Sequence, residues 1–211
     1  MPVPRFPVRR FPVRPAGRLA VTAGPGTPTR VLADSLPAGH AASLAVVVAG
    51  AAVIGLCAQV AFPLPGTPVP FTLQTFAVLM VAAALGPRRG VGAVALYVGA
   101  GLAGVPWFAP TATRGTAGYL VGFVVCAVVV GSLARRGLDR KVLTTAVVLA
   151  AGDLLVLFAG ATGLVLGLGF TPGQAVTAGV TPFVIGDAVK VVLASVLLPA
   201  AWRLVGTAPR E

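Results

Sequence analysis

The segment Phe183–Val205, which reads FVIGDAVKVVLASVLLPAAWRLV, decides the fold class of this chain. It is long enough to cross a membrane as a helix, which takes about 20 apolar residues. Two opposite charges interrupt it, Asp187 and Lys190, and no other charge precedes Arg203. A spacing of three residues puts both side chains on one face of a helix. Because ionisable groups at membrane depth are costly and usually face a cavity or a partner, this pair is the first candidate for function. The alternative is a self-satisfied ion pair that only stabilises packing.

The composition places the whole chain among integral membrane proteins. Of its 211 residues, 57% are hydrophobic and only 10% are charged, whereas soluble domains carry about 25% charged residues. The apolar residues come in long runs without strand-like alternation. We therefore expect an all-α membrane protein rather than a β-barrel.

Six apolar stretches are predicted to span the membrane as helices. They cover residues 41–62, 72–86, 91–106, 118–134, 142–162 and 183–204. The second stretch ends at GPRRG and the fourth at RRGLDRK, and the second and third are shorter than usual. We expect residues 39–206 to form one six-helix transmembrane domain, followed by a C-terminal tail at 207–211.

Residues 1–38 have a different composition from the rest of the chain. They are rich in Pro and Arg and contain no apolar core of signal-peptide length. We expect a disordered basic tail that stays near anionic lipid.

The basic residues predict the orientation of the chain in the cell membrane. With the N-terminus in the cytoplasm, Arg114 is the one basic residue in an outer segment and Lys190 lies within the membrane, while every other Lys and Arg falls on the inner side. This asymmetry favours six spans with both termini cytoplasmic. The net charge of +11 then reflects topology and not nucleic-acid binding. Residues 63–71, 106–117 and about 163–181 become the outer segments.

Several polar side chains are predicted to meet the charge pair in the outer half of the membrane. A helix that descends from Pro182 carries Asp187 and Lys190 about 7–12 Å below its start. Gln74 and Tyr119 lie near the outer ends of their spans, and Trp107 lies in the second outer segment. Asp153 lies midway along the fifth span, where it either lines a cavity or is protonated and hydrogen-bonded within the packing.

Motifs for catalysis and for metal or nucleotide binding are missing. Neither of the two lysines lies in a GK[ST] sequence, so no P-loop is present. His40 is the only histidine, which excludes an HExxH site, and the two cysteines are far apart in the sequence. We expect no metal site and no bound cofactor, and we expect ligand capture and transport. The alternative from another class is a membrane-embedded enzyme that uses Asp153 and Asp187.

Five motifs in order along the chain resemble one known family. They are VPFTLQTF (69–76), LGPRRG (85–90), GLAGVP (101–106) followed by Phe108, GYLVGF (118–123) and PFVIGDAVK (182–190). Together they resemble the biotin transporter substrate-binding component family, the S components of energy-coupling factor transporters. The resemblance covers roughly residues 41–205.

The resemblance implies a six-helix subunit that binds biotin from outside the cell. Its partners are a transmembrane coupling subunit and two cytoplasmic ATPases, which bind the ATP. Asp187 and Lys190 match the family's ligand-binding Asp and Lys. We expect Asp187 to accept the ureido N–H groups and Lys190 to pair with the carboxylate. An S component for another small vitamin is the alternative within transport.

The resemblance and the polar residues together give a set of site residues. The candidate substrate-binding residues are Asp187, Lys190, Gln74, Tyr119, Phe71, Trp107, Arg114 and Asp153. The segment 109–117 is shorter than the family's glycine-rich loop, so Arg114 reaches either the ligand or solvent. Ala45, Ala49 and Ala52 form a small-residue stripe that permits close helix approach. The resemblance implies a contact with the coupling subunit there, and internal packing is the alternative.

Overall fold

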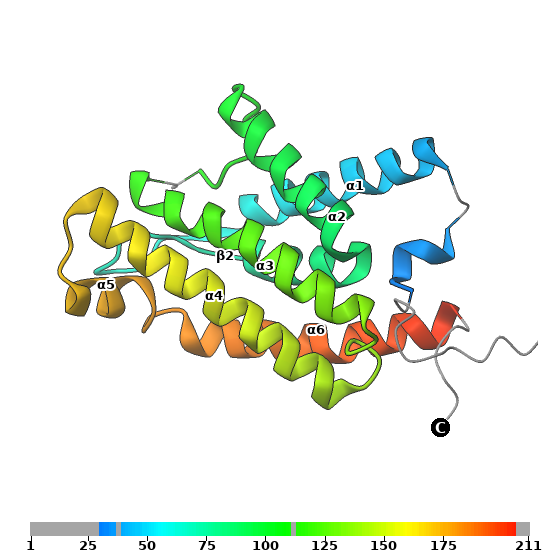
Figure 1. Cartoon of the computed structure of the whole chain (residues 1–211). Coiled ribbons are helices and arrows are strands. Elements are labelled where there is room, and N and C mark those ends of the chain that lie inside the picture. The colour runs from blue at the N-terminus through cyan, green and yellow to red at the C-terminus, as the bar shows by residue number, and fades with distance from the viewer. Residues whose placement is uncertain (1–29, 37–38, 111–112, 206–211) are drawn as a thin grey trace, which may run out of the picture.

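Helices make up almost all of the structure, as the long apolar runs predict. The computed structural model describes residues 30–36, 39–110 and 113–205. Figure 1 shows α3, α4 and α6 running side by side, with α1 and α2 on one side of them. The elements in chain order are η1 (Leu32–Ser35), α1 (His40–Gln59), β1 (Ala61–Phe62), β2 (Phe71–Thr72), α2 (Gln74–Leu102), η2 (Arg114–Thr116), α3 (Ala117–Arg135), α4 (Val142–Leu168), α5 (Pro172–Gly179) and α6 (Val184–Val205).

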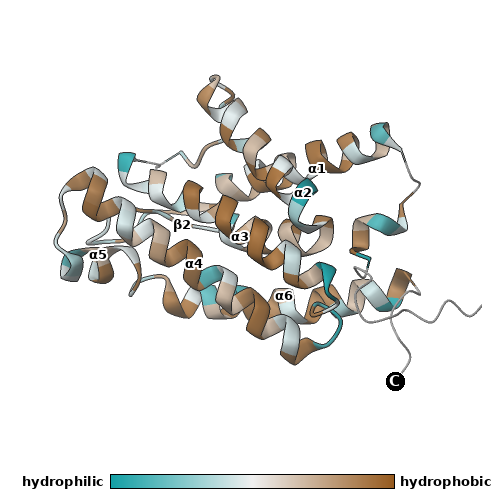
Figure 2. Cartoon of the chain, in the orientation of Figure 1, coloured by the Kyte–Doolittle hydropathy of each residue, from teal (hydrophilic) through white to brown (hydrophobic). Residues whose placement is uncertain are grey.

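Five helices of the described chain are long and apolar enough to cross a membrane. They are α1, α2, α3 with its preceding turn η2, α4 and α6. Figure 2 shows these helices mostly in the colours of apolar residues, with hydrophilic segments gathered near their ends and connections. Large apolar side chains also point outward along them, among them Leu56, Phe158 and Ile185. An apolar exterior suits lipid, so the chain is a multi-pass membrane protein.

A sharp bend divides α2 at Gly86, where two separate spans were expected to meet. Gly86 has φ +77° and ψ 178°, outside the helical region, and Pro87 follows it. An ideal Cβ on Gly90 would lie only 3.3 Å from the Cα of Ala82. Eight residues of straight helix cover about 12 Å. The two arms of α2, before and after Gly86, therefore fold back against each other.

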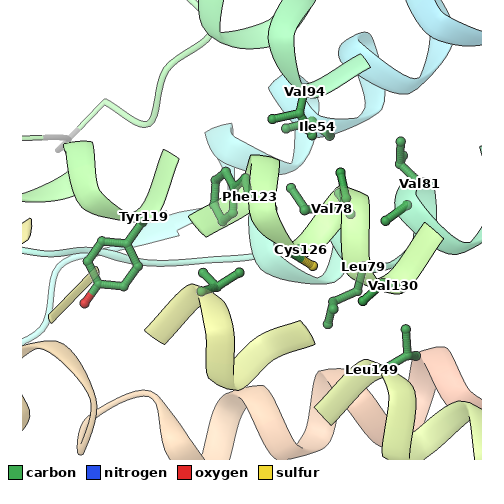
Figure 3. Close-up of a cluster of buried hydrophobic side chains, with 14 of the residues drawn as sticks. Ile54, Val78, Leu79, Val81, Val94, Tyr119, Phe123, Cys126, Val130 and Leu149 are labelled. Atoms are coloured by element: carbon green, nitrogen blue, oxygen red, sulfur yellow. The ribbon is translucent and has the colours of Figure 1, made fainter. Parts of the chain in front are cut away.

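The core forms around α3, which contacts both α2 and α4 extensively. Phe123, Cys126 and Val130 point from α3 into the buried cluster of Figure 3, where Leu79 of α2 and Leu149 of α4 join them. The apolar packing among these helices fixes their relative positions, and thereby the positions of the polar residues that they carry.

The N-terminal segment differs from its prediction in one part. A disordered tail was expected to reach residue 38, but residues 30–36 are ordered. Val31 is fully buried and packs against Gly86, and Asp34 Oδ1 lies 2.8 Å from Arg89 Nη1. An apolar contact and an ion pair hold this segment on the bend of α2, which its composition did not reveal. Residues 1–29 and 37–38 of the predicted tail, and residues 206–211, lie outside the described residues.

The predicted outer segments contain more regular structure than expected. The segment 63–70 connects the two strands of a small hairpin, in which Ala61 pairs with Thr72 and Phe62 with Phe71. The fifth predicted span extends beyond residue 162, because α4 continues to Leu168 and ends at Gly169, which has φ +69°. The third segment contains α5, which a capping box at its start stabilises.

Candidate ligand-binding site

A cavity of about 310 Å³ lies among the hairpin, both arms of α2, α3, α4 and α6. This volume is at the lower end of the range for small-molecule sites. Five of the eight predicted binding residues line it, namely Asp187, Lys190, Gln74, Tyr119 and Arg114. Helix α6 supplies the two charges, while α2, α3 and the turn before α3 supply the other three residues.

The two charges of α6 form one buried ion pair. Lys190 Nζ lies 2.7 Å from Asp187 Oδ1, and the two residues are 4% and 3% exposed. Lys190 Nζ also lies 4.0 Å from the centre of the Phe71 ring, which adds a cation–π contact. Because Asp187 and Lys190 are adjacent, they form one polar site on the cavity wall. They do not place one charge at each end of the cavity.

Gln74 and Tyr119 differ in how their polar atoms are used. Gln74 is buried at the start of α2, and its side chain lies near that of Tyr97, but its Nε2 does not complete a hydrogen bond of good geometry among the described residues. A buried donor without a partner costs free energy, and a ligand acceptor in the cavity would satisfy it. The Tyr119 hydroxyl instead donates to the carbonyl of Gly179 at 2.6 Å. Tyr119 thus ties α3 to α5 and offers the cavity mainly its ring.

Arg114 lies at the exposed edge of the cavity. It begins η2, the turn that leads into α3, and its side chain is exposed. Thr113, the residue before it, donates from its hydroxyl to the carbonyl of Pro68 at 3.0 Å. Among the described residues that line the cavity, Arg114 and Lys190 carry the positive charges, one at the surface and one buried.

Three of the predicted residues do not line the cavity. Phe71 lies behind Lys190 and stacks on Phe183 at 6.4 Å between ring centres. Trp107 turns toward α1, where its ring covers Gly55, and its Nε1 donates to the Tyr97 carbonyl at 2.9 Å. Asp153 is buried in α4, and its Oδ1 has no hydrogen-bond partner among the described residues.

The position of Asp153 relative to the cavity follows from its helix. Val156 and Leu157, three and four residues further along α4, line the cavity. Since such residues share a face with Asp153 one turn away, its carboxyl group lies just beyond the cavity wall. Asp153 therefore lies in the packing beside the cavity, but its Oδ1 lacks the hydrogen bond that the packed alternative included.

The set of candidate binding residues left out several apolar and aromatic residues of the wall, chiefly Tyr97, Phe108, Phe123 and Phe183, although Phe108 follows one of the quoted motifs. Tyr97 had a usable signal, because it and Tyr119 are the only two tyrosines in the chain. Phe123 had none, since aromatic residues in apolar helices are ordinary core residues. Phe108 and Phe183 lie in connections beside helices and belong to two of the quoted motifs, but their residue type alone did not mark them as wall residues.

The predicted small-residue stripe of α1 faces outward. Ala45 and Ala49 are exposed and Ala52 is half-buried, while Gly55, further along the helix, packs against Trp107. The alternative of internal packing is therefore wrong for Ala45 and Ala49.

Comparison with known proteins gives one consistent family. The model of the BioY family matches residues 29–207. The chain is 33% identical over 163 residues to biotin transporter BioY2 of Lactococcus lactis, covering 73% of this chain and 86% of the relative. It is 35% identical over 140 residues to biotin transporter BioY of Thermotoga maritima, covering 64% of this chain and 81% of the relative.

A solved structure has the same fold. It is the S-component for biotin from an ECF-type ABC transporter, with a TM-score of 0.70 and 19% sequence identity over 76% of this chain and 90% of that chain. With the family model covering most of the residues, the chain belongs to the BioY family.

Proposed function

We propose that this chain is the membrane subunit of an energy-coupling factor transporter that captures biotin. Relatives that share a third of its sequence are named biotin transporters. The observation that carries the proposal is the cavity, in which a buried ion pair and the buried amide of Gln74 lie in a largely apolar wall. Biotin has matching parts: a ureido group, an apolar ring and chain, and a carboxylate.

The geometry supports a specific orientation of biotin. The ureido N–H groups donate to Asp187, and the ureido carbonyl accepts from Lys190 and from the side-chain amide of Gln74. The ion pair can bind the ureido N–H groups and the ureido carbonyl together, because Lys190 Nζ and Asp187 Oδ1 are 2.7 Å apart. Arg114 at the exposed edge then takes the carboxylate. This arrangement replaces the sequence-based expectation that Lys190 pairs with the carboxylate.

The apolar part of the cavity suits the remainder of biotin. Phe123 and Leu120 of α3 and Leu157 of α4 line the wall together with Tyr97 and Phe108. Burial of the thioether ring and the aliphatic chain against these side chains supplies hydrophobic free energy, about 25 cal/mol for each Å² of apolar surface.

The proposed transport direction depends on the topology. The fold-back of α2 at Gly86 supports two separate crossings by its arms, which makes six spans in total. Six crossings would put both termini on one side, and the basic residues at the ends of the spans favour the cytoplasm as that side. Arg114 and the cavity edge then face the outside, which suits capture of an external vitamin at the cell membrane.

The partners follow from the transporter class. A transmembrane coupling subunit would dock on α1 along Ala45, Ala49 and Ala52, which leave room for close helix approach. Two cytoplasmic ATPases would bind the ATP and supply the energy. This chain itself would use no cofactor.

Equilibrium binding of radiolabelled biotin to the purified chain in detergent, without ATP, tests the proposal. We expect saturable binding without turnover, and at least a tenfold loss of affinity for Asp187→Asn, because a charge-assisted hydrogen bond contributes about 1.5–3 kcal/mol. Product formation would point instead to an enzyme that uses Asp153 and Asp187. Preference for a different vitamin over biotin would contradict the assigned ligand, and unchanged affinity in Asp187→Asn would contradict the assigned site.

A further inference from the structure

Asp153 is a buried carboxyl group that the proposed biotin contacts leave unused. It is the only titratable residue of α4. Only 6% of it is exposed, and its Oδ1 has no hydrogen-bond partner among the described residues. Ionisable groups at membrane depth are costly, so one that no contact of the fold explains is a candidate for function.

Apolar side chains surround this part of α4. At Gly152, the residue before Asp153, an ideal Cβ would lie 3.2 Å from both Cys126 Sγ of α3 and Leu79 Cδ2 of α2. Val156, one turn further along α4, is 1% exposed. A carboxylate ion in such surroundings loses its hydration without gaining a hydrogen bond at Oδ1, whereas the protonated group bears no charge. The packing therefore favours the neutral form of Asp153.

Asp153 also lies within electrostatic reach of the ion pair in the ligand site. The charges of Asp187 and Lys190 both act on its carboxyl group. These two charges already balance each other across a contact of 2.7 Å. A second carboxylate would leave a negative charge in excess and would compete with Asp187 for Lys190. Loss of the Asp153 proton would therefore disturb the pair that the biotin ureido group uses.

The other titratable groups that face α4 can be told apart from Asp153. They lie on α2, α3, α6 and η2, and they are Tyr97, Tyr119, Cys126, Asp187, Lys190 and Arg114. Helix α5 carries none, and the arginines at the bend of α2 and at the ends of α3 and α6 stay charged at every pH used. Because tyrosine titrates only near pH 10, the thiol of Cys126 is the main competitor of Asp153 below about pH 9.

We propose that Asp153 carries a proton in the folded chain and that its neutral form is a positioning residue for biotin binding, because it leaves Lys190 to Asp187 and to the ureido group. The inference rests on the proposed function. When the pH rises and Asp153 releases its proton to the solvent, Lys190 is shared between two carboxylates and donates less well to the ureido carbonyl. Biotin affinity then falls as the pH rises, and bound biotin in turn favours the protonated form.

Biotin affinity of the full chain in detergent, measured between about pH 6 and about pH 9, tests the proposal. Over this range the biotin carboxylate is already ionised. We expect the affinity of the wild type to fall about fivefold or more toward the upper end. The fall should be the same for biotinamide, since the proposed cause involves neither the ligand carboxylate nor Arg114.

The variant Asp153→Asn imitates the neutral carboxyl group and should flatten this profile. Near the upper end of the range it should bind biotin about fivefold or more tightly than the wild type. The matched control is Cys126→Ser, which removes the thiol that interacts electrostatically with Asp153. This control should keep the wild-type profile.

Infrared spectroscopy of the ligand-free chain gives a second measurement that needs no biotin. A protonated carboxyl group has a C=O stretching band that a carboxylate lacks. The difference between the wild type and Asp153→Asn separates the Asp153 band from those of other buried carboxyl groups, such as that of Asp139. We expect the band at the lower end of the range, and we expect it to disappear at the midpoint of the fall in biotin affinity.

Two results would overturn the proposal. If Asp153→Asn leaves the pH profile unchanged, another group titrates. If the Asp153 band is absent at every pH, the residue is ionised in the folded chain. A wild type that binds no biotin at any pH would contradict the proposed function and with it the role in binding, whereas the infrared band would still show separately whether Asp153 is protonated.

Calorimetry of the wild type replaces the variant if Asp153→Asn does not fold. At the midpoint of the profile, biotin binding should take up protons from the buffer, so the observed heat should depend on the ionisation enthalpy of the buffer. Biotinamide should show the same dependence. Equal heats in all buffers would contradict the proposal, and a dependence seen with biotin alone would assign the proton to the ligand carboxylate and overturn it as well.

Discussion

At the scale of single residues, the buried pair of Asp187 and Lys190 depends on each partner. Taking two charges out of water costs several kcal/mol per ion, and their attraction offsets this only with good geometry. The 2.7 Å contact and the Phe71 ring over Lys190 provide such geometry. The pair is therefore stable without a ligand, yet its remaining lone pairs and N–H groups can still bind one.

The sequence predicted most of the polar residues that line the cavity, but it did not predict the partner or direction of each side chain. The cost of charge at membrane depth identified Asp187 and Lys190 without any structural knowledge. The spacing along α6 could not show that the two charges neutralise each other, because that depends on side-chain rotamers. Nor could it show that Trp107 turns toward α1, since the space over Gly55 arises only when the helices pack.

Replacing Arg114 by Gln tests which cation binds the biotin carboxylate. The wild-type chain should bind biotin more tightly than biotinamide, which lacks the carboxylate charge. In Arg114→Gln the affinity for biotin should fall about tenfold while that for biotinamide stays nearly constant, since one charge-assisted pair is lost. Isothermal titration calorimetry with both ligands measures the four affinities.

The variant to compare with Arg114→Gln is Lys190→Gln, measured with the same two ligands. If Lys190 serves the ureido group, its loss should weaken biotin and biotinamide equally. If Lys190→Gln abolishes the preference for biotin over biotinamide and Arg114→Gln does not, then Lys190 and not Arg114 binds the biotin carboxylate.

Asp139, between α3 and α4, should make the stability of the chain depend on pH. It is 1% exposed, and its Oδ2 accepts from Trp202 Nε1 at 2.7 Å. Burial raises the pKa of this carboxyl, and the Trp202 bond and Arg140 only partly oppose the shift. A raised folded-state pKa means that Asp139 favours folding below its unfolded pKa of about 3.9, and that this contribution is lost as the pH rises through the folded-state value.

The variant Asp139→Asn removes this titration. Relative to wild type, its unfolding temperature should therefore rise between pH 4 and pH 7, as followed by tryptophan fluorescence in detergent. A difference between the two proteins that stays constant over this range would show that Asp139 titrates alike in both states.

At the scale of elements, the end of α1 holds one wall of the ligand cavity. Gln59, the last residue of α1, donates from Nε2 to the carbonyls of Trp107 at 2.9 Å and Phe108 at 3.2 Å. The Phe108 ring lines the cavity and meets Tyr97 edge-on at 5.4 Å between ring centres. One amide thus fixes the connection between α2 and η2 to a helix that is distant in sequence.

Replacing Gln59 by Leu should loosen this wall while preserving side-chain size. We expect biotin to dissociate about three- to tenfold faster, because two hydrogen bonds of about 0.5–1.5 kcal/mol each are lost at a partly exposed site. Stopped-flow measurements of dissociation give the rate. Iodide should also quench the fluorescence of Trp107 more strongly in the ligand-free variant.

The control for this prediction is Leu56→Ala, which changes the outward face of the same helix. Its side chain is 70% exposed, so dissociation and quenching should match the wild type. If Gln59→Leu also matches the wild type in both measurements, the amide does not position the wall.

At the scale of the whole molecule, hydropathy predicted the helical segments but placed several of their boundaries wrongly. Two of the predicted stretches, 72–86 and 91–106, lie in the two arms of α2. Long apolar runs mark helices because lipid leaves no other partner for the backbone. The GPRRG sequence was correctly read as a break, and it lies at the bend of α2. The order in residues 30–36 was missed, since it depends on Val31 filling the space at Gly86, a contact that exists only in the folded chain.

The outward face of α1 gives the last prediction, which concerns assembly of the whole transporter. Ala45 and Ala49 are exposed, so replacing both by Trp changes the surface of α1 without filling any internal space. Two large rings would prevent the close helix approach that small residues allow. Affinity purification of the coupling subunit should recover little of this double variant, while its biotin affinity in detergent stays within about twofold of wild type. Val192 and Val196 on α6, which are 60% and 51% exposed, offer a matched pair for the same change to Trp on another lipid-facing helix. Assembly that fails for the α1 pair and persists for the α6 pair assigns the docking surface to α1, whereas assembly that persists for both places the coupling subunit elsewhere.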